Sequence, residues 1–125
     1  MGDNTRDWEG LEDALDHLFR SAREGYVVVG TDIGGYLSRT AGLDTIPFDT
    51  DNFIRWTAAM GFAPFFQLHG QGNLTPWSIP DETRTEETIA AYRYWATLHS
   101  ELVPFFYSLA EEAYAGGDNI LRPIG

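Results

Sequence analysis

The 125-residue sequence contains no cysteine and no lysine. Without cysteine the chain can have no disulfide scaffold, no thiolate metal site and no cysteine nucleophile. Without lysine it has neither a P-loop lysine nor a lysine that could form a Schiff base. No apolar run approaches the roughly 20 residues of a membrane span, and no signal-peptide pattern opens the sequence. We therefore expect a soluble protein, cytoplasmic or secreted, whose chemistry depends on carboxylates, histidines and hydroxyls.

Positive charge is also scarce. Eight arginines face nineteen acidic residues, and the formal net charge is −11. Nucleic acids and anionic membranes both bind basic surfaces, so neither is expected as a partner. A neutral or cationic ligand suits this balance better. Apolar residues make up 43% of the chain, which is typical of a folded domain rather than a disordered one.

Apolar residues recur at helical spacing in three stretches. The first runs from Trp8 to Ala22, the second covers about 50–60, and the third covers about 86–115. Pro104 lies inside the third stretch, where a kink or break is expected because proline cannot donate to the helix ladder. Thr83 and Glu86 have the spacing of a capping box, which predicts the start of this helix.

Extended segments are predicted between these helices. The run at 26–30 is rich in valine and does not alternate with polar residues, which favours a strand buried on both faces. A second strand is expected at about 62–70, with Pro64 at its entry or at a bulge. Another strand is expected to begin at Ile120. Alternation of helices with parallel strands predicts an α/β fold.

Three polar side chains follow a predicted strand, or the position where one is expected. Asp3 precedes the first helix, Asp32 follows the strand at 26–30, and His69 lies at the end of the strand at 62–70. Each interval between them corresponds to about one βα unit. Ligands bind at the C-terminal ends of strands in parallel α/β folds. We therefore predict that these three side chains meet at one mouth.

Each of these residues also has a purely structural interpretation. Asp3 is as readily a turn or capping residue, and Asp32 beside glycines is as readily a turn former. His69 taken alone is more often structural. The functional interpretation depends on the three occurring together. Tyr36 and Trp77 lie in loops near the predicted mouth, where an aromatic ring either stacks on a sugar or anchors its loop.

Short motifs of a recognisable kind cover nearly the whole chain. In order, they are Gly2-Asp3-Asn4, Trp8-Glu9-Gly10-Leu11, Gly30-Thr31-Asp32-Ile33-Gly34-Gly35-Tyr36, Arg55-Trp56, Phe62-Ala63-Pro64-Phe65-Phe66 with His69-Gly70, Tyr94 with the stretch Leu102–Tyr107, and Arg122-Pro123. As a set, in this order and spacing, they resemble glycoside hydrolase family 31, the α-glucosidase and α-xylosidase family. None of the motifs would be specific alone.

The resemblance implies a (β/α)₈ TIM barrel and a retaining mechanism that uses two carboxylates. Residues 1–117 would form the C-terminal part of the barrel, about its last three βα units, and residues 118–125 would begin a following β-strand or domain. By resemblance, Asp3 is the general acid/base, while Asp32 and His69 bind hydroxyls of the sugar. The implied partner is a carbohydrate, an α-linked oligosaccharide or glycoside, with no metal and no other cofactor.

The sequence also departs from the family pattern. The family nucleophile lies on an earlier strand in a Trp-x-Asp-Met type of motif, and this sequence has no such motif. The arginine and tryptophan that usually precede the acid/base are absent as well. Gln67 stands where many members have an arginine two residues before the histidine matched by His69. We therefore expect a partial α-glycoside hydrolase, inactive alone, with its sugar and linkage left open.

Two other functions stay open at this stage. The chain could be a non-catalytic sugar-binding or interaction module that has kept Asp32 and His69. It could also be an unrelated α/β enzyme with an Asp/His site, such as a metal-dependent hydrolase, although ligand spacing for a metal is not evident. Sugar binding without turnover would favour the first alternative, and metal-dependent activity would favour the second.

Overall fold

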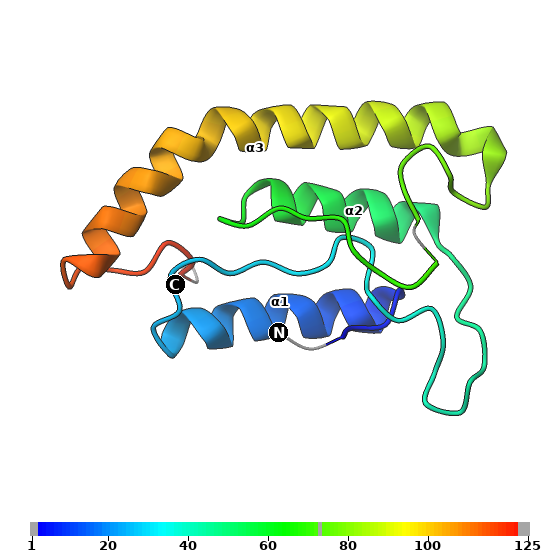
Figure 1. The fold of residues 1–125 in the computed structure, drawn as a ribbon, viewed down its shortest axis with the longest axis horizontal. Helices are drawn as coiled ribbons and strands as arrows, with labels where there is room; N and C mark the ends of the chain where they lie inside the picture. Colours follow the sequence, from blue (N-terminus) through cyan, green and yellow to red (C-terminus); the bar gives the residue numbers. More distant parts are fainter. Residues whose placement is uncertain (1–2, 73, 123–125) are drawn as a thin grey trace.

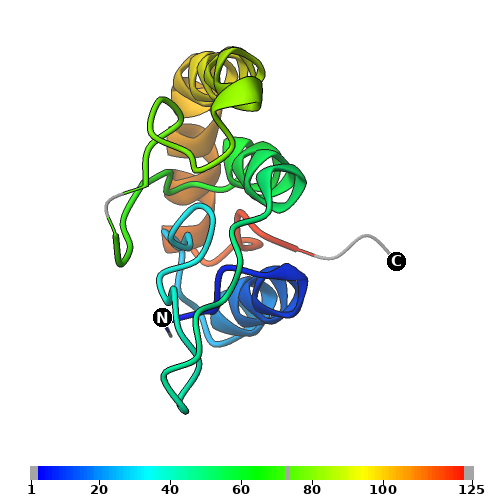
Figure 2. The same cartoon turned by 90° about the vertical axis from the view of Figure 1, so that its right-hand side faces the viewer.

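A computed structural model describes residues 3–72 and 74–122. It contains the helices α1 (Trp8–Arg23), α2 (Thr50–Gly61) and α3 (Thr85–Tyr114), with a short 3₁₀ turn, η1 (Glu82–Arg84), directly before α3. The three α-helices run side by side and begin at the same end of the molecule (Figure 1). Extended segments run back between them, and the loops gather on one side of the helices (Figure 2).

The first two helices confirm the predicted ones. Asp7 caps α1, because its carboxylate accepts a hydrogen bond of 2.8 Å from the backbone N–H of Gly10. Asp49 caps α2 in the same way, with a 3.0 Å bond from Asn52. The face of α1 that packs against the rest of the molecule has helical spacing and consists of Leu11, Ala14 and Leu18, with Ala22 beyond them.

Helix α3 confirms the long predicted helix, but it starts differently from the prediction. Pro104 lies inside it, and the helix bends in its C-terminal part (Figure 1). The predicted capping box is wrong. Thr83 lies within η1, where its backbone N–H and hydroxyl both bond to the carboxylate of Asp81. Thr83 therefore does not occupy the cap position of α3, and Arg84, which does, makes no side-chain capping bond.

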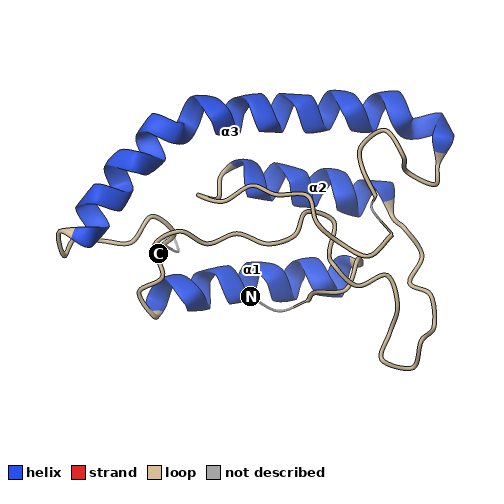
Figure 3. Cartoon of the chain, in the orientation of Figure 1, coloured by secondary structure: helices blue, strands red, loops and turns tan. Residues whose placement is uncertain are grey.

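The predicted strands are not formed in the residues that the structure describes (Figure 3). The segments at 26–30 and 62–70 stay extended, and isolated parallel bridges join Thr5 to Leu37 and Asp32 to Gln67. Pro64 lies in the second segment and has no N–H to donate, which limits any ladder there. In residues 3–72 and 74–122 the structure thus shows helices and extended segments with isolated parallel bridges, and the expected α/β architecture with a parallel sheet is not confirmed.

The strand expected from Ile120 is not seen either. Residues 118–122 are irregular, and residues 123–125 lie outside the described part of the chain. The side-chain amide of Asn119 donates to the carbonyl oxygens of Ala22 and Tyr26, at 3.0 Å each. These two bonds hold the segment after α3 against the end of α1.

The segment at 26–30 is covered on one face only. Val27 and Val29 are buried, whereas the Val28 side chain between them is 56% exposed. The prediction of a strand buried on both faces is therefore wrong. Alternate side chains of an extended chain point to opposite faces. The face that carries Val27 and Val29 is buried, whereas Val28 lines an open hollow of about 200 Å³ with residues of α3.

The core lies between α1, the extended segment at 29–33 and α2. Trp56 and Met60 of α2 are completely buried in it. The indole N–H of Trp56 donates to the hydroxyl of Thr31 at 2.8 Å, and that hydroxyl lies 3.2 Å from the sulfur of Met60. Helix α2 is thereby tied to the backbone immediately before Asp32.

Candidate functional site

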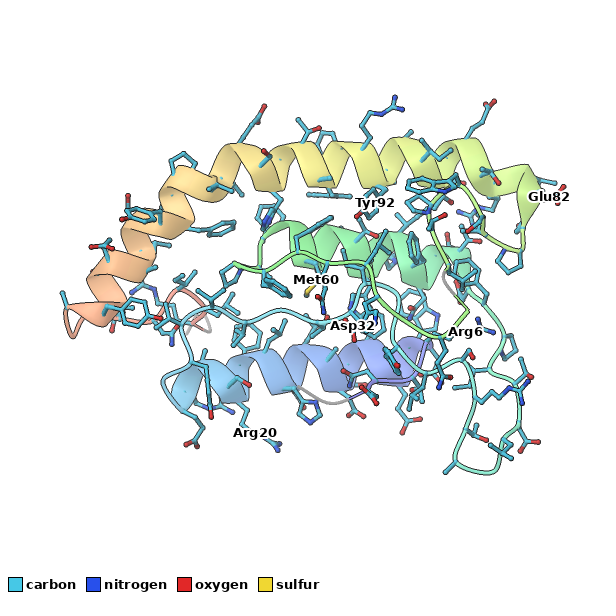
Figure 4. All side chains as sticks on the ribbon, viewed as in Figure 1. Arg6, Arg20, Asp32, Met60, Glu82 and Tyr92 are labelled. Atoms are coloured by element: carbon cyan, nitrogen blue, oxygen red, sulfur yellow. The ribbon has the colours of Figure 1, made fainter. Side chains whose placement is uncertain are left out.

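Asp32 lies where the first extended segment turns. Its backbone carbonyl accepts from the N–H of Gly35 at 2.9 Å, and the N–H of Ile33 donates to the carbonyl of Gln67 at 3.1 Å. The carboxylate is mostly buried, with 17% of the side chain exposed. Its Oδ1 accepts a hydrogen bond from the side-chain amide of Gln67. Asp32 thus lies between α1 and α2 (Figure 4).

His69 lies beside Asp32. Its Nδ1 is 3.9 Å from Oδ1 of Asp32, close enough for an ion pair when the imidazole is protonated. The imidazole is 68% exposed and packs against the ring of Tyr36, with 5.2 Å between the ring centroids. The structure therefore brings two of the three predicted site residues together. Tyr36 supports His69 in this arrangement.

Asp3 lies on the neighbouring segment. The carbonyl of Asn4 accepts from the N–H groups of Tyr36 and Leu37, both at 2.9 Å, and the N–H of Arg6 donates to the carbonyl of Leu37. The backbone thus places Asp3 next to the loop that follows Asp32. Its side chain is exposed and makes no hydrogen bond within residues 3–72 and 74–122. In the described residues, backbone hydrogen bonds of the neighbouring residues, and not its own side chain, connect Asp3 to the part of the chain that carries Asp32 and His69.

Gly35 makes this close approach possible. Its φ of +80° belongs to the left-handed region, and a Cβ at this position would lie 2.7 Å from the Cα of Arg6. Any side chain would push the segment at 3–6 away from the segment at 35–37. The glycines that follow Asp32 in the sequence therefore serve to pack two loops together, in addition to turning the chain.

Arg6 is a site neighbour that the sequence analysis did not identify. Its guanidinium donates to the carbonyl of Ile46 through Nε at 2.8 Å and through a terminal nitrogen at 2.6 Å. Burial lowers the pKa of Arg6. Arg6 and His69 both line a small hollow of about 20 Å³, and Arg6 lies near the start of α1 (Figure 4). The sequence feature that could have pointed to Arg6 is its position, as a single basic residue three positions after Asp3.

Asp49 has a structural role at the same end of the molecule. Besides capping α2, it accepts a 2.9 Å hydrogen bond from the indole N–H of Trp8. The backbone N–H of Asn52 is the largest influence on the Asp49 carboxyl and lowers its pKa. Asp49 therefore links the starts of α1 and α2.

Trp77 lies away from the Asp32–His69 pair. It lines a separate pocket of about 530 Å³ with residues of α3, among them Tyr92 and Glu101. Burial raises the pKa of Tyr92 in this pocket. The smaller hollow of about 130 Å³ beside His69 is lined by Leu68 to Gly70 and by the first part of the following loop. Of the two loop aromatics predicted near the mouth, Tyr36 lies there.

Residues 3–72 and 74–122 hold no group of three or more histidine, aspartate or glutamate side chains that could bind a metal ion. Within the same part of the chain, no helix combines the length and apolar character needed to cross a membrane.

Comparison with known proteins identifies the family. A family model described as the glycosyl hydrolases family 31 TIM-barrel domain matches residues 1–109. The neutral alpha-glucosidase C of Homo sapiens is 29% identical over 127 residues, which cover 98% of this chain and 12% of that protein. A probable glucan 1,3-alpha-glucosidase of Oryza sativa subsp. japonica is 29% identical over 126 residues, with the same two coverages.

A bacterial relative gives the same result. A 1,3-alpha-isomaltosidase of Kribbella flavida is 26% identical over 131 residues, which cover 98% of this chain and 17% of that protein. The chain thus spans between 12% and 17% of the length of these three relatives. The family model covers most of the chain, and it matches the family that the motifs resemble. The chain belongs to glycosyl hydrolase family 31.

Proposed function

We propose that this chain forms the C-terminal part of the catalytic barrel of a retaining α-glycoside hydrolase that acts on α-glucosides or related α-glycosides. Residues 1–117 are the barrel part, and residues 118–125 begin the segment that follows the barrel. The proposal is carried by one observation above all. Asp32 and His69, from two parallel extended segments, lie 3.9 Å apart near the end at which the helices begin.

In this proposal Asp32 and His69 bind the sugar that is cleaved. A carboxylate accepts hydrogen bonds from sugar hydroxyls, and a neutral imidazole both donates and accepts. The ring of Tyr36 holds the imidazole from one side. Together the two side chains fix the hydroxyls of one sugar ring and so orient its anomeric carbon.

Asp3 is the proposed general acid/base. In the first step a carboxylate attacks the anomeric carbon, the glycosidic C–O bond breaks, and Asp3 gives its proton to the leaving oxygen. In the second step the Asp3 carboxylate takes a proton from water, which attacks the same carbon and releases the nucleophile. The two carboxyl groups in retaining enzymes are about 5–5.5 Å apart.

In our proposal the nucleophile lies outside this sequence, because the sequence contains no Trp-x-Asp-Met motif of the kind that carries the family's nucleophile. The 125-residue chain alone is therefore inactive. Val28 and Phe65 are exposed and would face the interior of the barrel that other segments complete. Their exposure is consistent with one side of a barrel rather than a closed one.

An activity assay tests this proposal. The purified chain is incubated with 4-nitrophenyl α-glucoside and 4-nitrophenyl α-xyloside, and no nitrophenol release is expected. Turnover that is lost in Asp3→Asn would contradict the missing nucleophile and would direct attention to Asp44 or Asp49 as the second carboxylate. Of these, Asp49 is already engaged as a helix cap.

A non-catalytic sugar-binding module is the second candidate. It is favoured by one observation: Asp32 and His69 are placed together, whereas Asp3 makes no side-chain hydrogen bond in the described residues. Titration with methyl α-glucoside, followed by NMR, should show binding in the millimolar range that His69→Ala and Asp32→Asn both weaken. Binding that Asp3→Asn leaves unchanged, without turnover in any larger assembly, would favour this candidate over the hydrolase.

A further inference from the structure

Gln67 is tied to Asp32 in two independent ways. The two residues form a parallel backbone bridge, and the N–H of Ile33 donates to the carbonyl of Gln67 at 3.1 Å. In addition, Nε2 of Gln67 donates a hydrogen bond to Oδ1 of Asp32. The backbone bridge places Gln67 opposite Asp32, and its side-chain amide lies within reach of the carboxylate.

The two oxygens of the Asp32 carboxylate are placed differently. Oδ1 accepts from Gln67 and lies closest to His69. Oδ2 accepts no hydrogen bond from any residue that the structure describes, and the side chain keeps a 17% exposed fraction. One oxygen is therefore held by the protein, while the other remains an acceptor for a group from solvent or ligand.

We propose that Gln67 is the positioning residue of this site, which fixes the Asp32 carboxylate through Oδ1 and leaves Oδ2 to accept from a sugar hydroxyl. This inference rests on the proposed sugar-binding role of Asp32. It assigns Gln67 a role in place of the arginine that many family members have. Gln67 has no contact with the ligand itself and acts through Asp32.

The chemistry of the amide supports this role. An amide is a neutral donor and brings no compensating positive charge to the carboxylate, and a hydrogen bond from a hydroxyl to a charged carboxylate is stronger than one to a neutral acceptor. A guanidinium at the same position could engage both carboxylate oxygens at once and neutralise them. Glutamine holds one oxygen in place and leaves the second oxygen and the charge for the ligand.

A spectroscopic experiment tests the link between Gln67 and Asp32 without any ligand. In a pH titration of the whole chain, the Nε2 protons of Gln67 should shift together with the Cγ resonance of Asp32, and this shift should vanish in Asp32→Asn. Gln71 is the internal control, because its side-chain oxygen accepts from Ser38 and its amide is not bonded to Asp32. Chemical shifts of the Gln67 Nε2 protons that stay constant while the Asp32 Cγ resonance changes with pH would overturn the proposal.

A binding experiment then tests the consequence. Gln67→Leu removes the donor at similar size, and we expect it to weaken methyl α-glucoside binding by roughly tenfold, the effect of losing one hydrogen bond to a charged group. Gln71→Leu should bind like the unmodified chain. Equal affinities of Gln67→Leu and the unmodified chain, with binding lost in Asp32→Asn, would overturn the positioning role while the sugar site stands.

The two experiments also separate the inference from the function on which it rests. If the unmodified chain binds no sugar but the Gln67 protons follow the Asp32 carboxyl, the sugar-binding role of Asp32 in this chain is overturned. The hydrogen bond from Gln67 to the Asp32 carboxylate is then still supported by the NMR titration.

Discussion

The indole N–H of Trp56 donates to the hydroxyl of Thr31 at 2.8 Å in the buried core. Thr31 is the residue immediately before Asp32, so this bond joins α2 to the backbone that presents the candidate site. Both partners are buried, which makes the bond costly to lose, because a buried donor without an acceptor bears the full cost of its desolvation.

Replacement of Thr31 by valine tests this link. Thr31→Val keeps the shape of the side chain but removes the oxygen that accepts from Trp56, at an expected cost of about 1–3 kcal/mol. Exchange of the Trp56 indole proton with solvent, followed by NMR, should accelerate at least tenfold. Thr45→Val is the control, because Thr45 is exposed. Equal exchange rates in the two variants would contradict the prediction.

Gly35 and Gly72 form a matched pair for a test of the loop packing. Both have positive φ, +80° and +85°, but a Cβ at Gly35 would collide with the segment at 3–6, whereas a Cβ at Gly72 meets nothing within 4 Å. Gly35→Ala should therefore remove the exchange protection of the Tyr36 and Leu37 amides, while Gly72→Ala keeps it. Loss of protection in both variants would mean that backbone strain alone is responsible.

The Asp49 cap predicts a specific dependence on pH. The N–H of Asn52 lowers the Asp49 pKa below its ordinary value of 3.8. A carboxyl whose pKa is lowered in the folded state stabilises the fold at pH values above its ordinary pKa. This stabilisation is lost as the pH falls through the lowered pKa of the folded state. The Asp49 Cγ resonance should titrate with a midpoint below 3.8, and the indole proton of Trp8 should shift with it.

Its control is Asp49→Asn, which has no carboxyl to titrate. In this variant the Trp8 indole proton should show no transition in acid. A midpoint for the Asp49 resonance at or above 3.8 in the unmodified chain would contradict the capping bonds.

The exposed face of the segment at 26–30 predicts how the chain behaves in solution. Because Val28 is exposed and Val27 is buried, Val28→Thr should reduce the fluorescence of a bound hydrophobic dye and leave the helical circular dichroism unchanged. Val27→Thr should lower the helical signal. We also expect a broad thermal transition and self-association of the unmodified chain. A sharp cooperative melt of a monomer would count against an open apolar face.

The helices were predictable because their signals are local. In α1, apolar residues at spacings of three and four define the buried face that includes Leu11 and Leu18, and Asp7 lies where a cap is needed. The start of α3 was harder to predict, because Thr83 and Glu86 have the correct spacing but Thr83 lies inside the 3₁₀ turn that Asp81 caps. Sequence spacing does not show at which residue a helix begins when a short turn precedes it.

The strands and the site depended on distant parts of the chain. Whether the segment at 26–30 becomes a strand is decided by its neighbours, and Val28 shows that its second face is more than half exposed. The meeting of Asp32 with His69 followed from the expected parallel order. The bond from Gln67 did not, because the sequence does not show that a side chain two residues before His69 bends back to a carboxylate.

The part of α3 that follows Pro104 has none of the basic residues that end α1. Helices carry a partial negative charge at their C-terminus, which basic residues offset. Arg20 and Arg23 serve α1 in this way, whereas the last turn of α3 has no basic residue and contains Glu111 and Glu112. Repulsion between these carboxylates and the helix C-terminus destabilises this end of α3, and Pro104 removes one backbone hydrogen bond from the same helix. We therefore expect unwinding of α3 to begin at its C-terminus and to proceed toward Pro104.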